Sequence, residues 1–318
     1  MADVQQGAGG NAGRPRDALR IAAIWVFVSL VGDLLFGFLY GPHIPPGRMT
    51  SSAGGIQFDM KVLFLVALPV VFGVLVYMGY AVFTWSASKM RSAAPADNRS
   101  HLGVQIAWIA TTTFVVLGLF VFGTVELVIP AGSGGGEGPA PIWTPSSKTV
   151  LPIQVIAQQW KFTYRYPTFG GFETDQLLIP NDTAIAFHVT SLDVIHDFWA
   201  YQLGVKADAN PGQDNVAFTT PDQLGRFTVR CDELCGIWHG SMYNYGHVVS
   251  KADFEHWATT TEASLAAATK LLPAFAWSYI PSANGAGGSY YPETNPFSQV
   301  ETYGAATVSP AQAAAKSS

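Results

Sequence analysis

Four residues with metal-binding side chains fall within one twelve-residue stretch, from Cys231 to Met242. Cys231 and Cys235 supply two thiols, His239 supplies an imidazole and Met242 a thioether. Sulfur and imidazole ligands select copper or zinc over magnesium or calcium, and a weak axial methionine is typical of electron-transfer copper. The stretch therefore predicts a copper site.

A site of this kind needs a further ligand from elsewhere in the chain. His196 is the best candidate, because it lies at the end of a predicted strand. Two cysteines in an exported domain could instead form a disulfide, and a lone methionine is usually a core side chain. A disulfide would leave the matching offsets of His239 and Met242 unexplained, so the set as a whole favours copper. We interpret the remaining histidines as structural or surface residues: His43, His101, His188, His247 and His256.

A β pattern surrounds these residues. From about 149 to 257, short runs rich in Val, Ile, Phe and Thr alternate with turn residues, which is typical of a sandwich or barrel. We assign residues 149–260 to this domain and the Gly- and Pro-rich residues 131–148 to a linker. Residues 261–318 are predicted to hold the start of a helix and a flexible tail, and residues 1–17 a disordered N-terminus.

The N-terminal part, residues 18–130, is predicted to be a membrane region. It holds apolar runs at about 20–40, 62–86 and 104–128, and a helix needs about 20 apolar residues to cross the hydrocarbon core. The second and third runs are predicted spans. The first run is either a retained helix or a secretory signal, with Ser51-Ser52-Ala53 as a weak cleavage candidate. Its length exceeds the roughly 7–15 residues of a signal's apolar segment and favours a retained helix.

Basic residues indicate the orientation, because they favour the cytoplasmic side. Three precede the first run and three lie between the second and third, whereas the loop between the first two runs holds Arg48, with Lys61 at its edge. The N-terminus and the 87–103 loop are therefore predicted to be cytoplasmic. The chain is predicted to cross a bacterial-type plasma membrane several times, with its C-terminal domain on the outer, periplasmic side.

Composition supports this organisation. Hydrophobic residues make up 49% of the chain and charged residues 12%, against about 25% charged residues in typical soluble domains. From residue 131 onward there are 16 Asp and Glu and 9 Lys and Arg, a net charge of −7. The exported part is therefore a poor nucleic-acid binder and fits a basic partner. The sequence has no C-x-x-C-H stretch, so no attached c-type haem is expected.

Across roughly 60–257 the sequence resembles cytochrome c oxidase subunit II. The family pattern C-x-E-x-C-x-x-x-H-x-x-M stands at 231–242, the upstream D-V-x-H at 193–196, and 203–212 resembles the family's next stretch. The resemblance implies a membrane-anchored all-β fold, in which two or three N-terminal transmembrane helices precede a cupredoxin-like β-sandwich.

The resemblance also implies a dinuclear copper centre, called CuA. Cys231 and Cys235 would bridge both coppers as thiolates. His196 and His239 would each cap one copper, and Met242 would be a weak axial ligand. Sharing one electron over two coppers would keep the reorganisation on each transfer small, and contacts around the ligands would set the potential.

Two further residues receive roles from the resemblance. Glu233 would give its backbone carbonyl to copper and its side chain to a magnesium ion shared with subunit I. Trp160 matches the family's electron-entry tryptophan, although the residue alone suggests an aromatic side chain packed on the sandwich. Three departures indicate a divergent branch: Gln105 replaces a glutamate near a proton path, Phe162 a second tryptophan, and Asp232 a small serine.

The implied function is electron entry into an aerobic respiratory haem-copper oxidase. Cytochrome c would give electrons to CuA near Trp160, and haem in subunit I would receive them for reduction of O2 to water with proton pumping. The implied partners are subunit I, other oxidase subunits, cytochrome c and the lipid bilayer. No haem and no complete active site are expected on this chain alone.

Several alternatives share part of the pattern. The CuA subunit of a nitric-oxide reductase would use the same site and differ in its catalytic partner. A quinol oxidase subunit II would have the fold without the copper ligands. A membrane-anchored copper-delivery protein would have one membrane helix and alternating β and α elements, and an exported sandwich with a structural disulfide would bind no copper.

Overall fold

A computed structural model describes residues 14–44, 47–84, 102–129, 137–138, 141, 144–147, 149–272 and 275–277. The chain divides into two compact units, and each is described by itself. One contains residues 1–44 and 58–121, and the other residues 45–57 and 122–318. Most of the predicted N-terminal segment 1–17, of the linker 131–148 and of the tail within 261–318 lies outside the described residues.

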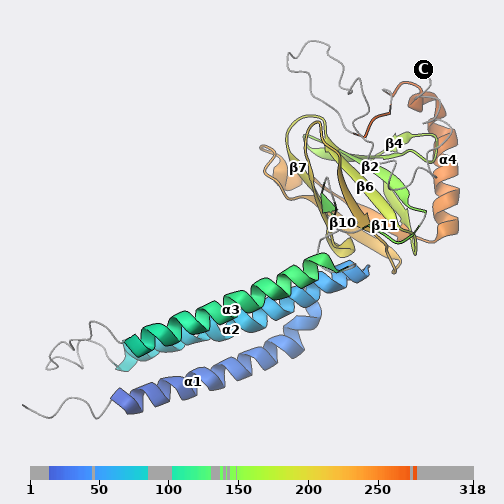
Figure 1. The fold of residues 1–318 in the computed structure, drawn as a ribbon. Helices are drawn as coiled ribbons and strands as arrows, with labels where there is room; N and C mark the ends of the chain where they lie inside the picture. The colour runs from blue at the N-terminus through green and yellow to red at the C-terminus, as the bar shows by residue number, and fades with distance from the viewer. Residues whose placement is uncertain are drawn as a thin grey trace, which may run out of the picture. The chain divides into compact units, whose positions relative to one another are not determined.

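Three apolar helices are long enough to cross a membrane (Figure 1). α1 spans Arg14–Leu35 and continues through short turns, Phe36–Tyr40 and Gly41–His43. α2 spans Ser51–Thr84 and α3 Leu102–Val128. The apolar segments contain 28, 34 and 27 residues, and a span needs about 20. The first apolar run is therefore a helix of full spanning length.

α1 packs against α2 within the unit that contains residues 1–44 and 58–121. The Trp25 indole Nε1–H donates to the carbonyl oxygen of Pro69 at 2.7 Å. Gly32 allows a close approach, because a Cβ at this position would lie 2.2 Å from the Phe72 ring. These contacts place the first apolar run directly against α2.

Two helices begin earlier than the sequence predicts. α1 starts at Arg14, inside the segment predicted to be disordered, because proline is tolerated in the first turn of a helix and Pro15 stands there. α2 starts at Ser51 rather than near residue 62, because the Thr50 hydroxyl caps it by accepting from the Ala53 N–H at 3.0 Å. The cleavage candidate Ser51-Ser52-Ala53 is thus the first turn of α2.

The second unit is a β-sandwich of two sheets (Figure 1). One sheet has the strand order β1-β9-β6-β2-β3-β4 and the other β5-β11-β10-β7-β8. The strands are β1 (Glu137–Gly138), β2 (Leu151–Gln158), β3 (Lys161–Tyr166), β4 (Phe172–Thr174), β5 (Leu177–Pro180), β6 (Ile185–Ser191), β7 (His196–Ala200), β8 (Val205–Ala209), β9 (Asn215–Thr219), β10 (Gly225–Cys231) and β11 (Tyr243–Val249). The predicted architecture, apolar helices followed by a cupredoxin-like sandwich, is confirmed.

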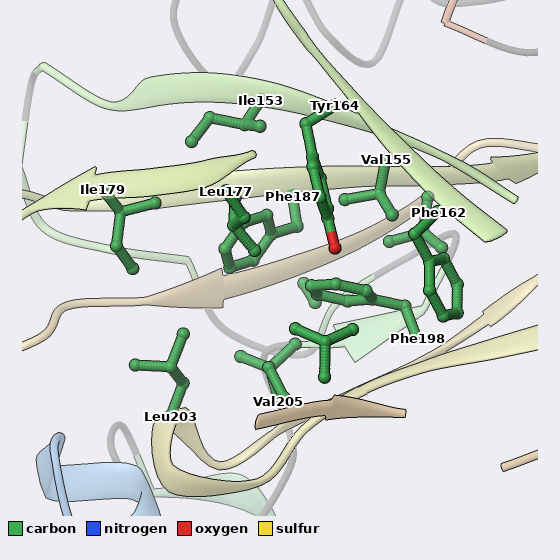
Figure 2. Close-up of a cluster of buried hydrophobic side chains, with 14 of the residues drawn as sticks. Ile153, Val155, Phe162, Tyr164, Leu177, Ile179, Phe187, Phe198, Leu203 and Val205 are labelled. Carbon is green, nitrogen blue, oxygen red and sulfur yellow. The ribbon is translucent and has the colours of Figure 1, made fainter. Parts of the chain in front are cut away.

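Large side chains from both sheets meet in the core between them (Figure 2). Phe187 of β6 and Phe198 of β7 lie with ring centroids 5.1 Å apart, and Tyr164 of β3 packs on Phe198 at 6.4 Å. All three are fully buried, and burial of one such side chain contributes about 1.5–3 kcal/mol. This core fixes the strand ends on which the chemistry depends.

The helix α4 (Lys251–Thr269) follows the last strand. The Ser250 hydroxyl caps it by accepting from the Asp253 N–H at 3.1 Å. Its Trp257 packs edge-on against Tyr166 and Phe172 of the six-stranded sheet. The helix therefore covers β3 and β4 and belongs to the sandwich.

Residues 275–277 return to the six-stranded sheet. The carbonyl of Trp277 accepts a hydrogen bond from buried Gln154 of β2 at 3.0 Å, and its ring stacks on His188 of β6 at 3.8 Å. The guanidinium of Arg165 lies over the Phe275 ring. This part of the segment predicted to be flexible is thus held on the domain, because its aromatic side chains cover polar residues of the sheet.

The segment before α2 also packs on the sandwich. Met49 donates its N–H to the carbonyl of Gln202 at 2.9 Å and accepts from the Asp222 N–H at 2.9 Å. The Thr50 hydroxyl donates to the carbonyl of Leu203. These bonds hold residues 49 and 50 on the sandwich, within the same unit.

Candidate metal centre

Three strand ends bring the predicted ligands together. β10 ends at Cys231 and its antiparallel neighbour β11 begins at Tyr243, so the loop between them carries Cys235, His239 and Met242. The Cys231 N–H donates to the Met242 carbonyl at 3.0 Å and closes this loop. β7 pairs with β10 on its other side and begins at His196. Residues far apart in sequence therefore meet at one end of one sheet.

The side chains converge on one small volume. The Cys231 and Cys235 sulfurs lie 3.7 Å apart. His196 Nδ1 lies 3.8 Å from the Cys231 sulfur, and His239 Nδ1 lies 3.6 Å from the Cys235 sulfur. The Met242 sulfur is 3.9 Å from that of Cys235. The structure thus brings together two thiols, two imidazoles and a thioether at the distances of a shared ligand cluster.

Burial separates the cluster from its rim. His196, Cys231, Cys235 and Met242 are buried, whereas His239 is half-buried. The side chain of Glu233 is exposed, while its carbonyl accepts a hydrogen bond from the Cys231 thiol at 3.2 Å. The Glu233 carbonyl is therefore at the cluster and its carboxylate is free to reach outward.

Asp193 orients the buried imidazole of His196. Its Oδ1 lies 2.8 Å from His196 Nε2, which leaves Nδ1 facing the Cys231 sulfur. Carboxylates of this kind fix the ring and raise the basicity of a ligating histidine. Burial opposes ionisation of Asp193, but the N–H groups of Gln159 and Val194 and the His196 ring outweigh it and lower the pKa of Asp193. An ionised aspartate is thus held against the ring.

The two thiols differ in their ease of ionisation. Burial opposes ionisation of Cys231, but hydrogen bonds from the His196 ring and the backbone outweigh it and lower the pKa of this thiol. Burial and the nearby Cys231 sulfur raise the pKa of Cys235. The pair therefore loses its first proton more easily than its second.

A charged cluster lies beside the ligand loop. Lys206 Nζ is 2.5 Å from an oxygen of Asp232 and 3.7 Å from one of Asp197. Burial raises the pKa of Asp197 to about 7, against the opposing effect of Lys206. Asp232, a departure from the family pattern, therefore has a partner in Lys206.

The predicted electron-entry residue, Trp160, contacts the ligand loop. Trp160 is half-buried at the turn between β2 and β3, and its indole Nε1–H donates to the Cys235 carbonyl at 3.1 Å. Gln159 donates its side-chain amide to the same oxygen at 2.8 Å. Sequence reasoning found Trp160 and missed Gln159, because the contact spans 76 residues.

The donor set fits copper. His196, Cys231 and Cys235 have ligand atoms within 4.8 Å of one another, and a thioether completes the set at 3.9 Å from a thiol. Soft sulfur donors with imidazole select copper or zinc, and a nearby thioether favours copper. His188 lies elsewhere, 2.8 Å from Asp214, and His43 contacts the Leu39 carbonyl. Residue 101 lies outside the described residues.

The fold and the cluster together define a class: a membrane-anchored, cupredoxin-like sandwich with a two-cysteine metal centre. The family described as "Cytochrome C oxidase subunit II, periplasmic domain" matches residues 172–249. This match and the curated relatives given below support a divergent cytochrome c oxidase subunit II. The predicted resemblance is thus confirmed.

Individual relatives give the extent of the match. The chain is 36% identical over 131 residues to the probable cytochrome c oxidase subunit 2 of Rickettsia conorii, covering 35% of this chain and 42% of the relative. It is 33% identical over 141 residues to cytochrome c oxidase subunit 2 of Candida albicans, covering 36% of this chain and 54% of the relative. The chain therefore spans about half the length of the curated relatives that it matches, or less.

Among solved structures, the chain is similar to the periplasmic domain of subunit II of cytochrome oxidase (CoxB) of Bradyrhizobium japonicum. The identity is 32%, and the match covers 36% of this chain and 94% of that chain, with a TM-score of 0.35. The named relatives are all oxidase subunits, so the nitric-oxide reductase and copper-delivery alternatives are not favoured.

Proposed function

We propose that this chain is the electron-entry subunit of an aerobic respiratory haem-copper oxidase. It accepts electrons from cytochrome c at a dinuclear CuA centre and passes them to haem in subunit I, where O2 is reduced to water with proton pumping. The single observation that carries the proposal is the buried cluster of two thiols, two imidazoles and a thioether, with neighbouring ligand atoms 3.6–3.9 Å apart.

The residues have distinct parts in this proposal. Cys231 and Cys235 would hold copper through their thiolates, and His196 and His239 through their imidazoles. The Met242 thioether and the Glu233 carbonyl would complete the set. When bound, the copper pair accepts and gives up one electron.

The protein contributes rigidity around the centre. The ligand loop is closed by the Cys231–Met242 backbone bond, and Asp193 holds the His196 ring. Ligands fixed in this way need little movement when the charge of the centre changes. The exposed Glu233 carboxylate is available to a magnesium ion shared with subunit I.

The donor side is at the β2–β3 turn. Trp160 is half-buried next to the ligand loop, where an aromatic ring connects a docked haem edge to the thiolates. The net charge of −7 from residue 131 onward attracts a basic cytochrome c. In this proposal the sandwich faces the periplasm, as the basic residues of the N-terminus and the 87–103 loop predict, and the apolar helices anchor the chain in the plasma membrane beside subunit I and the other oxidase subunits.

The test is an EPR spectrum with copper quantified on the full chain, purified in detergent and loaded with Cu(II) after its thiols are reduced and the reductant is removed. We expect about two coppers per chain and a hyperfine pattern from one electron shared over both, because two bridging thiolates are available. A single-copper spectrum would contradict the proposal. So would a chain that binds no copper after the Cys231 and Cys235 thiols are reduced.

A further inference from the structure

The β2–β3 turn contacts both segments that carry the candidate ligands, the start of β7 and the β10–β11 loop. The backbone N–H of Gln159 donates to Asp193 Oδ2 at 2.7 Å, and Asp193 holds His196. The side chain of Gln159 donates to the carbonyl of Cys235 at 2.8 Å. One residue thus connects the β7 ligand and the β10–β11 ligand loop.

The Cys235 carbonyl receives two donors, and they differ in length. The Gln159 bond, 2.8 Å, is at the short side of the usual N–H···O range, whereas the Trp160 bond is 3.1 Å. The shorter bond holds the carbonyl oxygen more firmly. Loss of the Gln159 amide would leave this oxygen with the longer contact alone.

The packing at Gly236 shows how close the turn and the loop are. Gly236 has φ +118°, and a Cβ there would lie 3.0 Å from Gln159 Nε2 and 3.1 Å from Trp160 Cζ2. Only glycine adopts this backbone conformation without strain and leaves room for both side chains. The ligand loop therefore lies directly against the amide of Gln159 and the indole of Trp160.

The hydrogen bond between the Trp160 indole and the Cys235 carbonyl links the predicted electron-entry residue to the ligand loop. A bonded connection from the Trp160 ring to the Cys235 sulfur runs from the indole N–H through the hydrogen bond to the Cys235 carbonyl, and then through the carbonyl carbon, Cα and Cβ to Sγ. The hydrogen bond is the one non-covalent link in that connection. Its length therefore controls the electronic contact between the ring and the thiolate.

We propose that Gln159 is a positioning residue for electron entry: its side-chain amide fixes the Cys235 carbonyl against the Trp160 indole. The inference rests on the proposed function and deepens it. Gln159 acts through Cys235 and Trp160 and is not itself a metal ligand or an electron carrier.

The main test compares Gln159→Met with Gln158→Met in the assembled oxidase. Methionine keeps much of the side-chain length and removes the donor, and Gln158 is the matched control one residue earlier on β2. We expect the first-order rate of copper reduction within the cytochrome c complex to fall about tenfold in Gln159→Met, since displacing reacting groups by about 1 Å is costly. The copper content, EPR pattern, reduction potential and KM for cytochrome c should match those of the control.

A double-substitution cycle sharpens the result. Trp160→Phe keeps an aromatic ring and removes its N–H donor, so it acts on the same carbonyl. Combining it with Gln159→Met should slow reduction by less than the product of the single effects, because the two changes break one connection. Full multiplicativity would overturn the inference.

A second readout uses the copper-free protein. With 15N-labelled tryptophan, the Trp160 indole N–H should exchange with solvent several-fold faster in Gln159→Met than in Gln158→Met, because the carbonyl that accepts it is less constrained. Equal exchange and equal reduction rates in the two variants would overturn the role of Gln159. Absence of a dinuclear EPR pattern in the unsubstituted chain would instead overturn the proposed function.

Discussion

The sandwich contains two histidine–aspartate pairs in which the histidine is buried and a ring nitrogen lies close to a carboxylate oxygen. His196 Nε2 lies 2.8 Å from Asp193, and His188 Nδ1 lies 2.8 Å from Asp214. The histidine side chains are 0% and 2% exposed. Their surroundings differ: the remaining nitrogen of His196 faces a thiol, whereas the His188 ring is covered by Trp277.

The comparison shows that a histidine–carboxylate pair does not by itself mark a metal site. In both pairs the carboxylate fixes the ring, which is useful for ligation and for packing alike. The other contacts of the ring separate the two functions. A thiol sulfur faces one ring and an indole covers the other. The proposed ligation therefore falls on His196, and the contact that holds residues 275–277 falls on His188.

The largest effect is expected on the copper spectrum, from substitution of the two histidines. His196→Asn should abolish the dinuclear copper spectrum, because the capping imidazole of one copper is lost. His188→Asn should leave the spectrum and copper content unchanged. EPR with copper quantification on both purified variants provides the measurement. A copper loss in His188→Asn equal to that in His196→Asn would mean that the two pairs are not distinct in function.

Asp197 differs from Asp193 and Asp214. It is a buried carboxyl next to His196, and the structure does not pair it with a histidine ring. Burial raises its pKa from 3.8 to about 7, so the folded state holds a proton that the unfolded state releases. Its contribution favours folding at acid pH and is lost as pH rises from about 4 to about 7. One pKa unit corresponds to about 1.4 kcal/mol, so up to about 4 kcal/mol is lost above pH 7.

Asp197→Asn should remove this loss in the copper-free protein. The stability of the variant relative to the unsubstituted chain should increase between pH 5 and pH 8, while the contributions of the two thiols are common to both proteins. Thermal unfolding at several pH values measures the difference. A stability difference that does not change with pH would show that Asp197 does not titrate in this range.

Asp193 and Asp214, the partners of the two histidines, should affect copper binding and stability respectively. Asp193→Asn should weaken copper binding roughly 10–100-fold, as is usual when the partner of a ligating histidine is changed. Asp214→Asn should leave copper binding unchanged and lower the stability by about 1–3 kcal/mol, because a buried hydrogen-bonding group loses its charged partner. Copper competition titrations and thermal unfolding measure the two effects. A weakening of copper binding by Asp214→Asn would contradict the assignment.

The sequence predicts a candidate ligand set because most of its members stand within twelve residues, and the structure brings these side chains together. Cys231, Cys235, His239 and Met242 lie on one loop, and the spacing alone indicates a shared metal. The distant residue His196 is the best further candidate from its position at the end of a predicted strand, and the resemblance implies the same role. The alternation of apolar and turn residues predicts a sandwich or barrel, and the resemblance implies the sandwich.

Contacts that depend on the fold could not be predicted in this way. Gln159 and Cys235 are 76 residues apart, and only the approach of the β2–β3 turn to the ligand loop joins them. Asp214 is 26 residues from His188. The composition of the chain after residue 270 indicates a flexible segment, but two aromatic residues, Phe275 and Trp277, are enough to hold part of it on the sheet.

The smallest expected effect concerns the cover over His188. Trp277→Leu should remove the ring stacked 3.8 Å from the imidazole, and such aromatic contacts contribute about 0.5–1.5 kcal/mol beyond burial. The stability should fall by about that amount plus the lost burial, while the copper spectrum stays the same. Leu271→Ala is the matched control, because this leucine of the same segment is 87% exposed. Thermal unfolding and EPR of both variants measure the two effects.

An unchanged stability in Trp277→Leu would show that the indole does not hold residues 275–277 on the sheet. A changed EPR spectrum would show that the His188–Asp214 pair affects the copper site.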